Sequence, residues 1–167
     1  NILKRPETNE QIHHAIDILE KYKVSYSLDY ILGLPQQEEK ELKDAANFFS
    51  KLKYCYRISP FMLSYLPKLK IVDFAIEHDL LNKDEPERIE EGLHGNYMDK
   101  GSDMEKNRRK LMQTYKLLFR SMSFMSPWMR KFFYKTKMYY IFYIIPFDFI
   151  LRTLDLTMVF RDRDAKA

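Results

Sequence analysis

The residues best suited to chemistry lie in one short segment, positions 25–35, with the sequence SYSLDYILGLP. The alternation of a strand puts its tyrosines and leucines on one face, and Ser25, Ser27, Asp29 and Ile31 on the other. A buried parallel strand is ordinarily apolar on both faces, so we infer that the polar face looks into a polar interior. Ligands of α/β folds bind at the carboxyl ends of strands, where Gly33 would let a ligand approach the backbone. The segment therefore predicts a ligand site.

Other reactive side chains give weaker indications. Cys55 is the single cysteine, which excludes a disulfide framework and a multi-cysteine metal or cluster site within this chain. The four histidines lack the clustering that metal ligation requires. Arg57 could pair with Asp29 or with a substrate carboxylate, although an exposed arginine at a strand start is the preferred interpretation. Tyr65 could border a substrate or pack at the rim of the sheet, and both alternatives stay open.

Hydrophobic periodicity places this segment in the order helix, strand, helix, strand, helix, which is an α/β pattern. A capping box of Thr8 and Gln11 begins the first helix. The two strands lie about 25 residues apart, the spacing of a βαβ unit, so we expect parallel neighbours. Two strands cannot close a sheet, so we expect a fragment whose missing strands lie upstream of Asn1. The expected ranges are 8–22, 25–33, 37–52, 57–65 and 67–78.

Residues 83–167 are expected to form a mainly helical extension, with helices after Ser102, from Pro127 to Pro146, and over 147–160. Between Glu105 and Lys137 there are ten Lys/Arg and one acidic residue. The preferred interpretation of this block is a solvated helix face, with anionic lipid, nucleic acid or an acidic domain as alternatives. The aromatic residues within 128–149 are expected to pack the extension against the first part or a partner, with a membrane surface or apolar substrate as the alternative.

Composition predicts a globular protein, since 46% of the residues are hydrophobic and 31% are charged. No signal peptide pattern is present. The most apolar run, 138–151, contains Pro146 and Asp148 and is too short to span a bilayer. The single cysteine fits a reducing compartment, so we expect a cytoplasmic location.

The run from Asp29 to Pro35, followed by acids at Glu38 and Glu39, resembles the radical S-adenosylmethionine (SAM) enzymes. It is most similar to the branch with a Gly-Leu-Pro turn after the fifth barrel strand, many of whose members carry an upstream cobalamin-binding domain. The similarity extends over roughly residues 4–82. Its other landmarks are Arg5-Pro6 and the pattern Phe61-x-Leu63-x-Tyr65-x-Pro67 at the sixth strand.

This resemblance implies that residues 1–82 are the C-terminal fragment of a partial (βα)6 barrel of the TIM type, and that 83–167 are a helical extension. It implies that the full-length protein uses a 4Fe-4S cluster, held by a CxxxCxxC loop outside this chain, to cleave SAM and start radical chemistry on an unknown small-molecule substrate. Cobalamin is a possible further cofactor. We expect this chain to be inactive alone, to join the N-terminal part of the same protein, and to have no nucleic-acid partner.

The resemblance also assigns residues to the SAM pocket. The family pattern G-x-I-x-G-x-x-E matches at Ile31 and Gly33, whereas Asp29 stands at the first glycine and Gln36 at the glutamate. Gln36-Gln37 replaces the Gly-Glu that commonly follows the Gly-Leu-Pro turn. The residues expected to border SAM are Asp29, Ile31, Gly33, Leu34, Pro35 and Tyr65.

A function of a different class remains as the alternative, a non-catalytic interaction module. In that case the basic, aromatic-rich helices would bind a partner protein or an anionic surface. Salt-sensitive binding by residues 102–167, with no SAM affinity in the full-length protein, would favour it. A complete small α/β domain is a third interpretation, disfavoured because two strands leave a sheet edge exposed.

Overall fold

The computed structural model describes residues 6–66, 68–78, 87, 91 and 106–144. This part of the chain is a mixed α/β structure, as the sequence predicts. Its elements, in chain order, are α1 (Asn9–Lys21), β1 (Tyr26–Leu32), α2 (Glu39–Lys51), β2 (Cys55–Met62), α3 (Lys70–Glu77), α6 (Lys106–Met122), α7 (Pro127–Lys135) and the 3-10 helix η1 (Met138–Tyr143).

The two strands pair in parallel, which confirms the expected β1–α2–β2 unit. The register places Ser27 opposite Arg57, Asp29 opposite Ser59 and Ile31 opposite Phe61. A register shift between positions 26 and 27 of β1 leaves an extra residue in β2, the mark of a β-bulge. Each pair therefore puts one side chain from each strand on the same face of the sheet.

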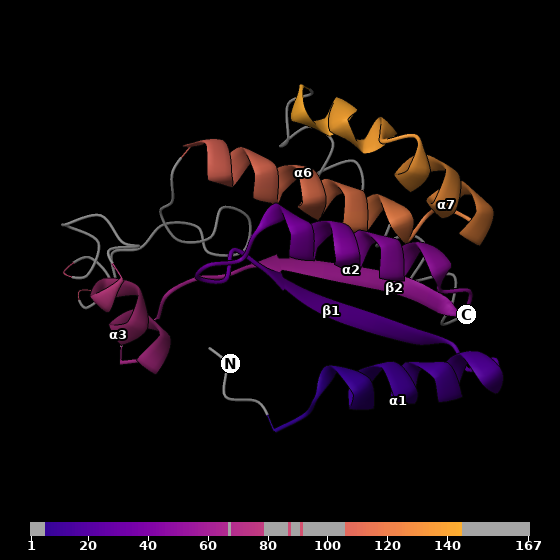
Figure 1. Ribbon diagram of the computed structural model, residues 1–167, viewed down its shortest axis with the longest axis horizontal. Coiled ribbons are helices and arrows are strands. Elements are labelled where there is room, and N and C mark those ends of the chain that lie inside the picture. The colour runs from indigo at the N-terminus through magenta and orange to yellow at the C-terminus, as the bar shows by residue number, and fades with distance from the viewer. Residues whose placement is uncertain (1–5, 67, 79–86, 88–90, 92–105, 145–167) are drawn as a thin grey trace.

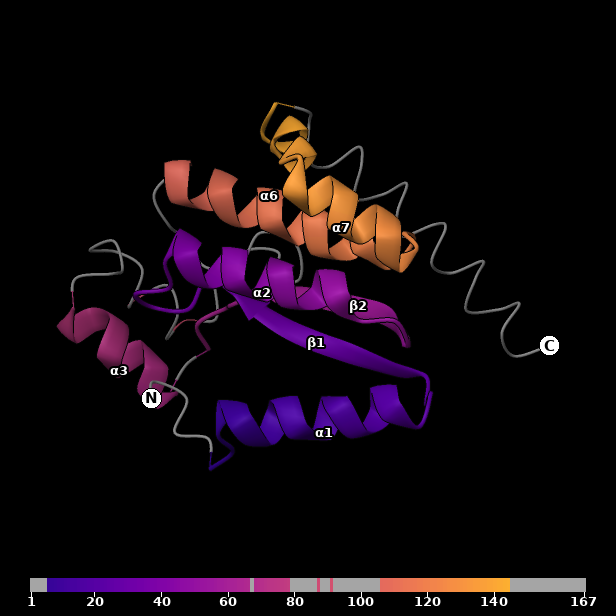
Figure 2. The ribbon, with the colours of Figure 1, turned by 45° about the vertical axis from the view of Figure 1, so that its right-hand side comes forward.

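Helices cover the strands unequally. Figures 1 and 2 show α2 and α6 stacked on one side of the strand pair, with α1 on the other side of β1 and α3 beyond the strands' carboxyl ends. Under α2 and α6 lies the main core, which includes Leu32 and Ile58 from the sheet and Tyr115 and Phe119 from α6. This core joins residues from both sides of the expected boundary between 82 and 83.

The start of α1 forms as expected, because Thr8 and Gln11 make the capping box through two hydrogen bonds of 3.3 and 2.8 Å. At its other end, the Glu20 carboxylate fixes α1 to the sheet. It accepts a hydrogen bond from the Tyr26 hydroxyl at 2.7 Å and bonds from the backbone N–H groups of Lys53 and Tyr54 at 3.0 Å. This carboxylate thus ties the α1–β1 and α2–β2 connections together.

The second strand begins at Cys55 and ends at Met62, earlier than the predicted 57–65. The expected ranges 37–52 and 57–65 place Cys55 in the turn between helix and strand, but it is a buried strand residue, so that prediction was wrong. The Ile58 N–H points to the outer edge of β2 and donates to the Ser123 hydroxyl at 2.9 Å. By strand alternation the missing N–H of Pro60 falls on that same edge, so the proline removes no bond to β1.

Part of the basic block is buried, so the prediction of a solvated face was wrong at two positions. Lys116 and Arg130 are only 1% and 4% exposed. Arg130 donates to the backbone carbonyls of Met125, Leu52 and Cys55 at 2.9, 3.1 and 3.1 Å. These three bonds explain why a guanidinium is stable inside the protein, since every carbonyl bond is charge-assisted.

Two further helix predictions need correction. The helix expected to run from Pro127 to Pro146 ends at Lys135, because Lys137 adopts a left-handed conformation with φ of 55° before η1 begins. The helical spacing of Leu69, Val72, Ala75 and Ile76 predicts one inward face for α3. Val72 and Ala75 are indeed buried, but Leu69 and Ile76 are exposed. The helix expected after Ser102 is confirmed as α6, which is described from Lys106 onward, whereas the helix expected over 147–160 lies outside the described residues.

Candidate functional site

The turn between β1 and α2 has two residues in the left-handed region. Gly33 has φ of 84° and Gln36 has φ of 60°. This conformation costs a residue with a Cβ roughly 1–2 kcal/mol, so glycine is the natural occupant of both positions. The structure thus explains Gly33 as a conformational requirement and shows that Gln36 adopts a backbone geometry that glycine favours.

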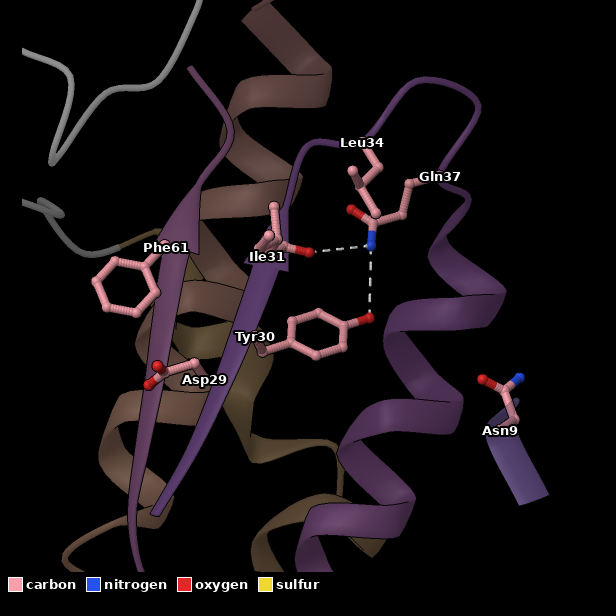
Figure 3. Close-up of a pocket in the computed structure, with 7 residues that line it drawn as sticks. All are labelled: Asn9, Asp29, Tyr30, Ile31, Leu34, Gln37 and Phe61. Atoms are coloured by element: carbon pink, nitrogen blue, oxygen red, sulfur yellow. Dashed lines mark hydrogen bonds between the residues drawn. The ribbon is translucent and has the colours of Figure 1, made fainter. Parts of the chain in front are cut away.

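The side chain of Gln37 holds this turn in place (Figure 3). Its Oε1 accepts a hydrogen bond from the Gly33 N–H at 2.7 Å, and its Nε2 donates to the Tyr30 hydroxyl at 3.4 Å and the Ile31 carbonyl at 3.5 Å. Gln37 is buried, at 9% exposure. The helix α2 begins at Glu39 rather than at the predicted residue 37, since Glu38 and Glu41 form the capping box. Gln37 is therefore free to bond across the turn.

A second contact fixes the same turn from the far side of the chain. Arg108 of α6 donates from Nη2 to the Leu34 carbonyl at 2.9 Å. The backbone N–H of Gln37 donates to that carbonyl too, at 3.0 Å. The turn is therefore held both by Gln37, which precedes α2, and by Arg108 of α6.

A cavity of about 690 Å³ opens beside this turn, at the carboxyl end of β1. Figure 3 shows Asp29, Ile31 and Phe61 projecting from the strands, with the Tyr30 ring directed toward α2. The volume falls within the range typical of small-molecule sites, about 300–1,000 Å³. The lining residues are Asn9, Asp29, Tyr30, Ile31, Leu34, Gln37 and Phe61.

The polar face of the sheet is exposed rather than enclosed. Ser27 and Asp29 are exposed and Ile31 is half-buried. On the neighbouring strand the Arg57 Nε donates to the Ser59 hydroxyl at 3.1 Å. The expected polar interior would need protein beyond the described residues to cover this face.

The structure brings together three of the six residues predicted to border a ligand. Asp29, Ile31 and Leu34 line the cavity. Gly33 and Pro35 are buried in the turn, where they shape the backbone. Tyr65 belongs instead to a second small core with Val72 and Ala75 of α3.

Four lining residues were missed as site residues from the sequence. Phe61 pairs with Ile31, so the two lie on the same face of the sheet, and the alternation of Phe61 with Arg57 and Ser59 was the available signal. Tyr30 lies on the opposite face of β1, and desolvation, reinforced by the charge of Glu41, raises the pKa of its hydroxyl. Asn9 and Gln37 carry no sequence signal for this position, because one comes from the distant α1 and the other from the helix entry.

The chemistry available at the cavity is that of binding rather than of metal ligation. Asp29 supplies an exposed carboxylate that can accept hydrogen bonds, and Ile31, Leu34 and Phe61 supply apolar surface. In the ranges described above, no group of three or more His, Cys, Asp or Glu side chains could hold a metal ion. Burial raises the pKa of the Cys55 thiol, which disfavours the thiolate that ligation would need.

Comparison with known proteins finds a relative of part of the chain. Over 74 residues the chain is 31% identical to an uncharacterized protein of Methanocaldococcus jannaschii. The match covers 44% of this chain and 15% of that protein, so this chain spans a small part of that relative's length. No protein-family model matches the chain, and no solved structure matches it.

Proposed function

We propose that this chain is the C-terminal portion of a radical SAM enzyme, and that the cavity at the end of β1 borders the adenosine part of SAM. One observation carries the proposal: the Gly-Leu-Pro turn, the carboxyl end of a parallel strand and a cavity of suitable size coincide. Ligands of parallel α/β folds bind at this end of the strands.

The turn itself supports the resemblance on which the proposal rests. In the similar enzymes a glycine and a glutamate commonly follow the Gly-Leu-Pro turn, where this chain has Gln36 and Gln37. Gln36 keeps the left-handed conformation that suits that glycine. Gln37 keeps a side-chain oxygen directed at the Gly33 N–H, which a glutamate could also provide. The replacements are therefore compatible with the same turn.

Within the cavity the residues have separate tasks. Ile31 and Leu34 offer apolar surface for the flat adenine base. Asp29 offers a carboxylate that can accept hydrogen bonds from ribose hydroxyls. Gln37 and Arg108 act through the turn, by fixing its backbone.

In our proposal, the ligands of the 4Fe-4S cluster lie outside this chain. Cys55 is a single buried thiol and does not fit as a cluster ligand. In the full-length enzyme a bound 4Fe-4S cluster supplies one electron for the reductive cleavage of SAM. The substrate is a small molecule, and cobalamin remains a possible further cofactor.

The first experiment is to determine the reading frame upstream of Asn1. A CxxxCxxC motif roughly 100–200 residues upstream, the length of four βα units, is the expected result. Three closely spaced cysteines justify anaerobic reconstitution and an assay for 5′-deoxyadenosine. An upstream reading frame without three closely spaced cysteines would contradict the proposal.

A variant then tests the cavity in the full-length protein. Ile31→Ala removes apolar surface worth about 1.5 kcal/mol, so the KM for SAM should rise about tenfold. Ile76→Ala makes the same change at an exposed position of α3, away from the cavity, and should leave the KM unaltered. Equal KM values for the two variants would contradict the assignment of this cavity to SAM.

Hydrogen exchange provides a readout that does not depend on activity. The Leu63 N–H donates to the Leu32 carbonyl, so by alternation Ser27, Asp29 and Ile31 direct their backbone groups to the outer edge of β1. In a barrel, that edge pairs with a preceding strand. These amides should exchange rapidly in the 167-residue chain and slowly in the full-length protein. Rapid exchange in both would contradict the barrel but not the SAM site.

A further inference from the structure

The helix α7 has one buried side and one exposed apolar side. Arg130 faces inward, and Phe133 and Tyr134 pack against the main core. Trp128 and Phe132 face outward and are 70% and 53% exposed. Met129, beside them, is 42% exposed. The expected packing of the aromatic residues against the first part of the chain is therefore seen on only one side of this helix.

Within its own segment of the chain, only positive charge accompanies this exposed apolar surface. Lys131 and Lys135 are exposed and lie one helical turn apart, as do Trp128 and Phe132. Lys137 lies two residues after Lys135 and is exposed as well. From position 106 to 147 the sequence contains no aspartate or glutamate. The surface therefore combines large apolar side chains with lysines and lacks any acidic residue of its own segment.

This combination favours an anionic lipid surface over other occupants. Tryptophan and phenylalanine place their rings at the boundary between headgroups and acyl chains, while lysines reach anionic headgroups with their long side chains. A nucleic acid would be contacted through cationic and hydrogen-bonding groups, but three apolar side chains occupy the outward side and the arginine is engaged with carbonyls. An anionic lipid surface matches both the apolar side chains and the lysines of this surface.

We propose that α7 docks on an anionic membrane surface through Trp128, Met129 and Phe132, with Lys131 and Lys135 contacting lipid headgroups. A nine-residue helix is only about 14 Å long, so it lies along the surface and does not cross the bilayer. None of the described helices is long and apolar enough for a membrane span. The proposal is independent of the SAM site.

The protein carries its own probe for the test, because Trp128 is its single tryptophan. Fluorescence of the 167-residue chain is measured with vesicles of phosphatidylcholine alone and with vesicles of equal parts phosphatidylcholine and phosphatidylglycerol. The expected result is a blue shift, with quenching by lipids brominated on their acyl chains, for the anionic vesicles alone. The shift should diminish as salt screens the lysines.

Charge neutralisation sharpens the test and keeps the tryptophan. Each lysine near an anionic membrane contributes about 1 kcal/mol, so Lys131→Gln with Lys135→Gln should weaken binding about 30-fold. Lys40→Gln with Lys70→Gln removes two exposed lysines on other helices and should change the affinity less than threefold. Both double variants alter surface residues, and their folding is checked by circular dichroism.

Several outcomes would overturn the proposal. The absence of a blue shift with anionic vesicles would do so, as would equal shifts for neutral and anionic vesicles. A shift with a single-stranded oligonucleotide and none with lipid would identify a nucleic-acid surface instead. A shift that depends on protein concentration without lipid would identify a second copy of this chain as the occupant.

Discussion

Replacement of Gln37 by leucine should destabilise the chain by about 2 kcal/mol. The substitution keeps the size of a buried side chain but removes the acceptor for the Gly33 N–H, which is then buried without a partner. Such an unsatisfied donor costs about 1–3 kcal/mol. The two longer bonds, to the Tyr30 hydroxyl and the Ile31 carbonyl, add little at 3.4 and 3.5 Å.

Urea unfolding followed by far-UV circular dichroism measures this loss. With a slope of roughly 2 kcal/mol per molar urea, the midpoint should fall by about 1 M. Trp128 is exposed, which makes its fluorescence a poor probe of unfolding. Hydrogen exchange gives a local readout, because the Gly33 amide should lose protection in the variant.

The matched control is the same substitution one residue earlier. Gln36 is exposed, and leucine there keeps the chain length and the side-chain change, so the midpoint should move by the equivalent of about 0.5 kcal/mol or less. If Gln37→Leu and Gln36→Leu have the same midpoint, the Gln37 side chain does not hold the turn. An unchanged exchange rate at the Gly33 amide would refute the hydrogen bond itself.

Three other contacts give predictions of the same kind. Desolvation raises the pKa of the Glu20 carboxyl, but hydrogen bonds from Tyr54, Tyr26 and Lys53 outweigh it and lower the net pKa. The stabilisation by the ionised Glu20 is therefore present above the ordinary carboxyl pKa of about 4.3 and is lost as the pH falls through the lower folded pKa. Glu20→Gln should lower the free energy of unfolding by about 1 kcal/mol at pH 7, and urea titrations should show this difference shrinking toward pH 3. Arg130→Met leaves three carbonyls without their donor and should cost about 2–4 kcal/mol in thermal unfolding, whereas Lys131→Met at the exposed neighbour should cost under about 0.5 kcal/mol. Ser123→Ala leaves the Ile58 N–H unpaired and should cost about 1–3 kcal/mol, and an amide of Ile58 that stays protected in this variant would contradict the contact.

Local patterns predicted the βαβ unit because its signals are short-range. The capping box of Thr8 and Gln11 spans three residues, and the buried face of α2 follows a helical repeat through Leu42, Ala46 and Phe49. The parallel pairing follows from the length of chain between the strands, since a crossover helix fits that interval. Each of these features depends on neighbours in the sequence.

Long-range contacts explain what local patterns could not predict. Arg130 bonds to carbonyls 75 and 78 residues away, so its burial has no signature within its own helix. Gln37 appeared to belong to α2 by periodicity, but its side chain bonds back across the turn. In the aromatic stretch, the left-handed Lys137 ends the helix although neither glycine nor proline marks the position.

The two edges of the sheet differ in a way that bears on the proposed enzyme. The outer edge of β2 is met by the Ser123 hydroxyl at the connection between α6 and α7, so this side of the sheet is covered. On β1, the outward Ile31 carbonyl accepts a long contact of 3.5 Å from Gln37. The polar residues Ser27 and Asp29 on the same strand are exposed. Within the described residues, the outer edge of β2 bonds to the Ser123 hydroxyl, whereas the outer edge of β1 pairs with no strand and could receive one. This asymmetry supports the proposal that β2 is the last strand of a barrel and that the cavity beside Asp29 lies on its inner side.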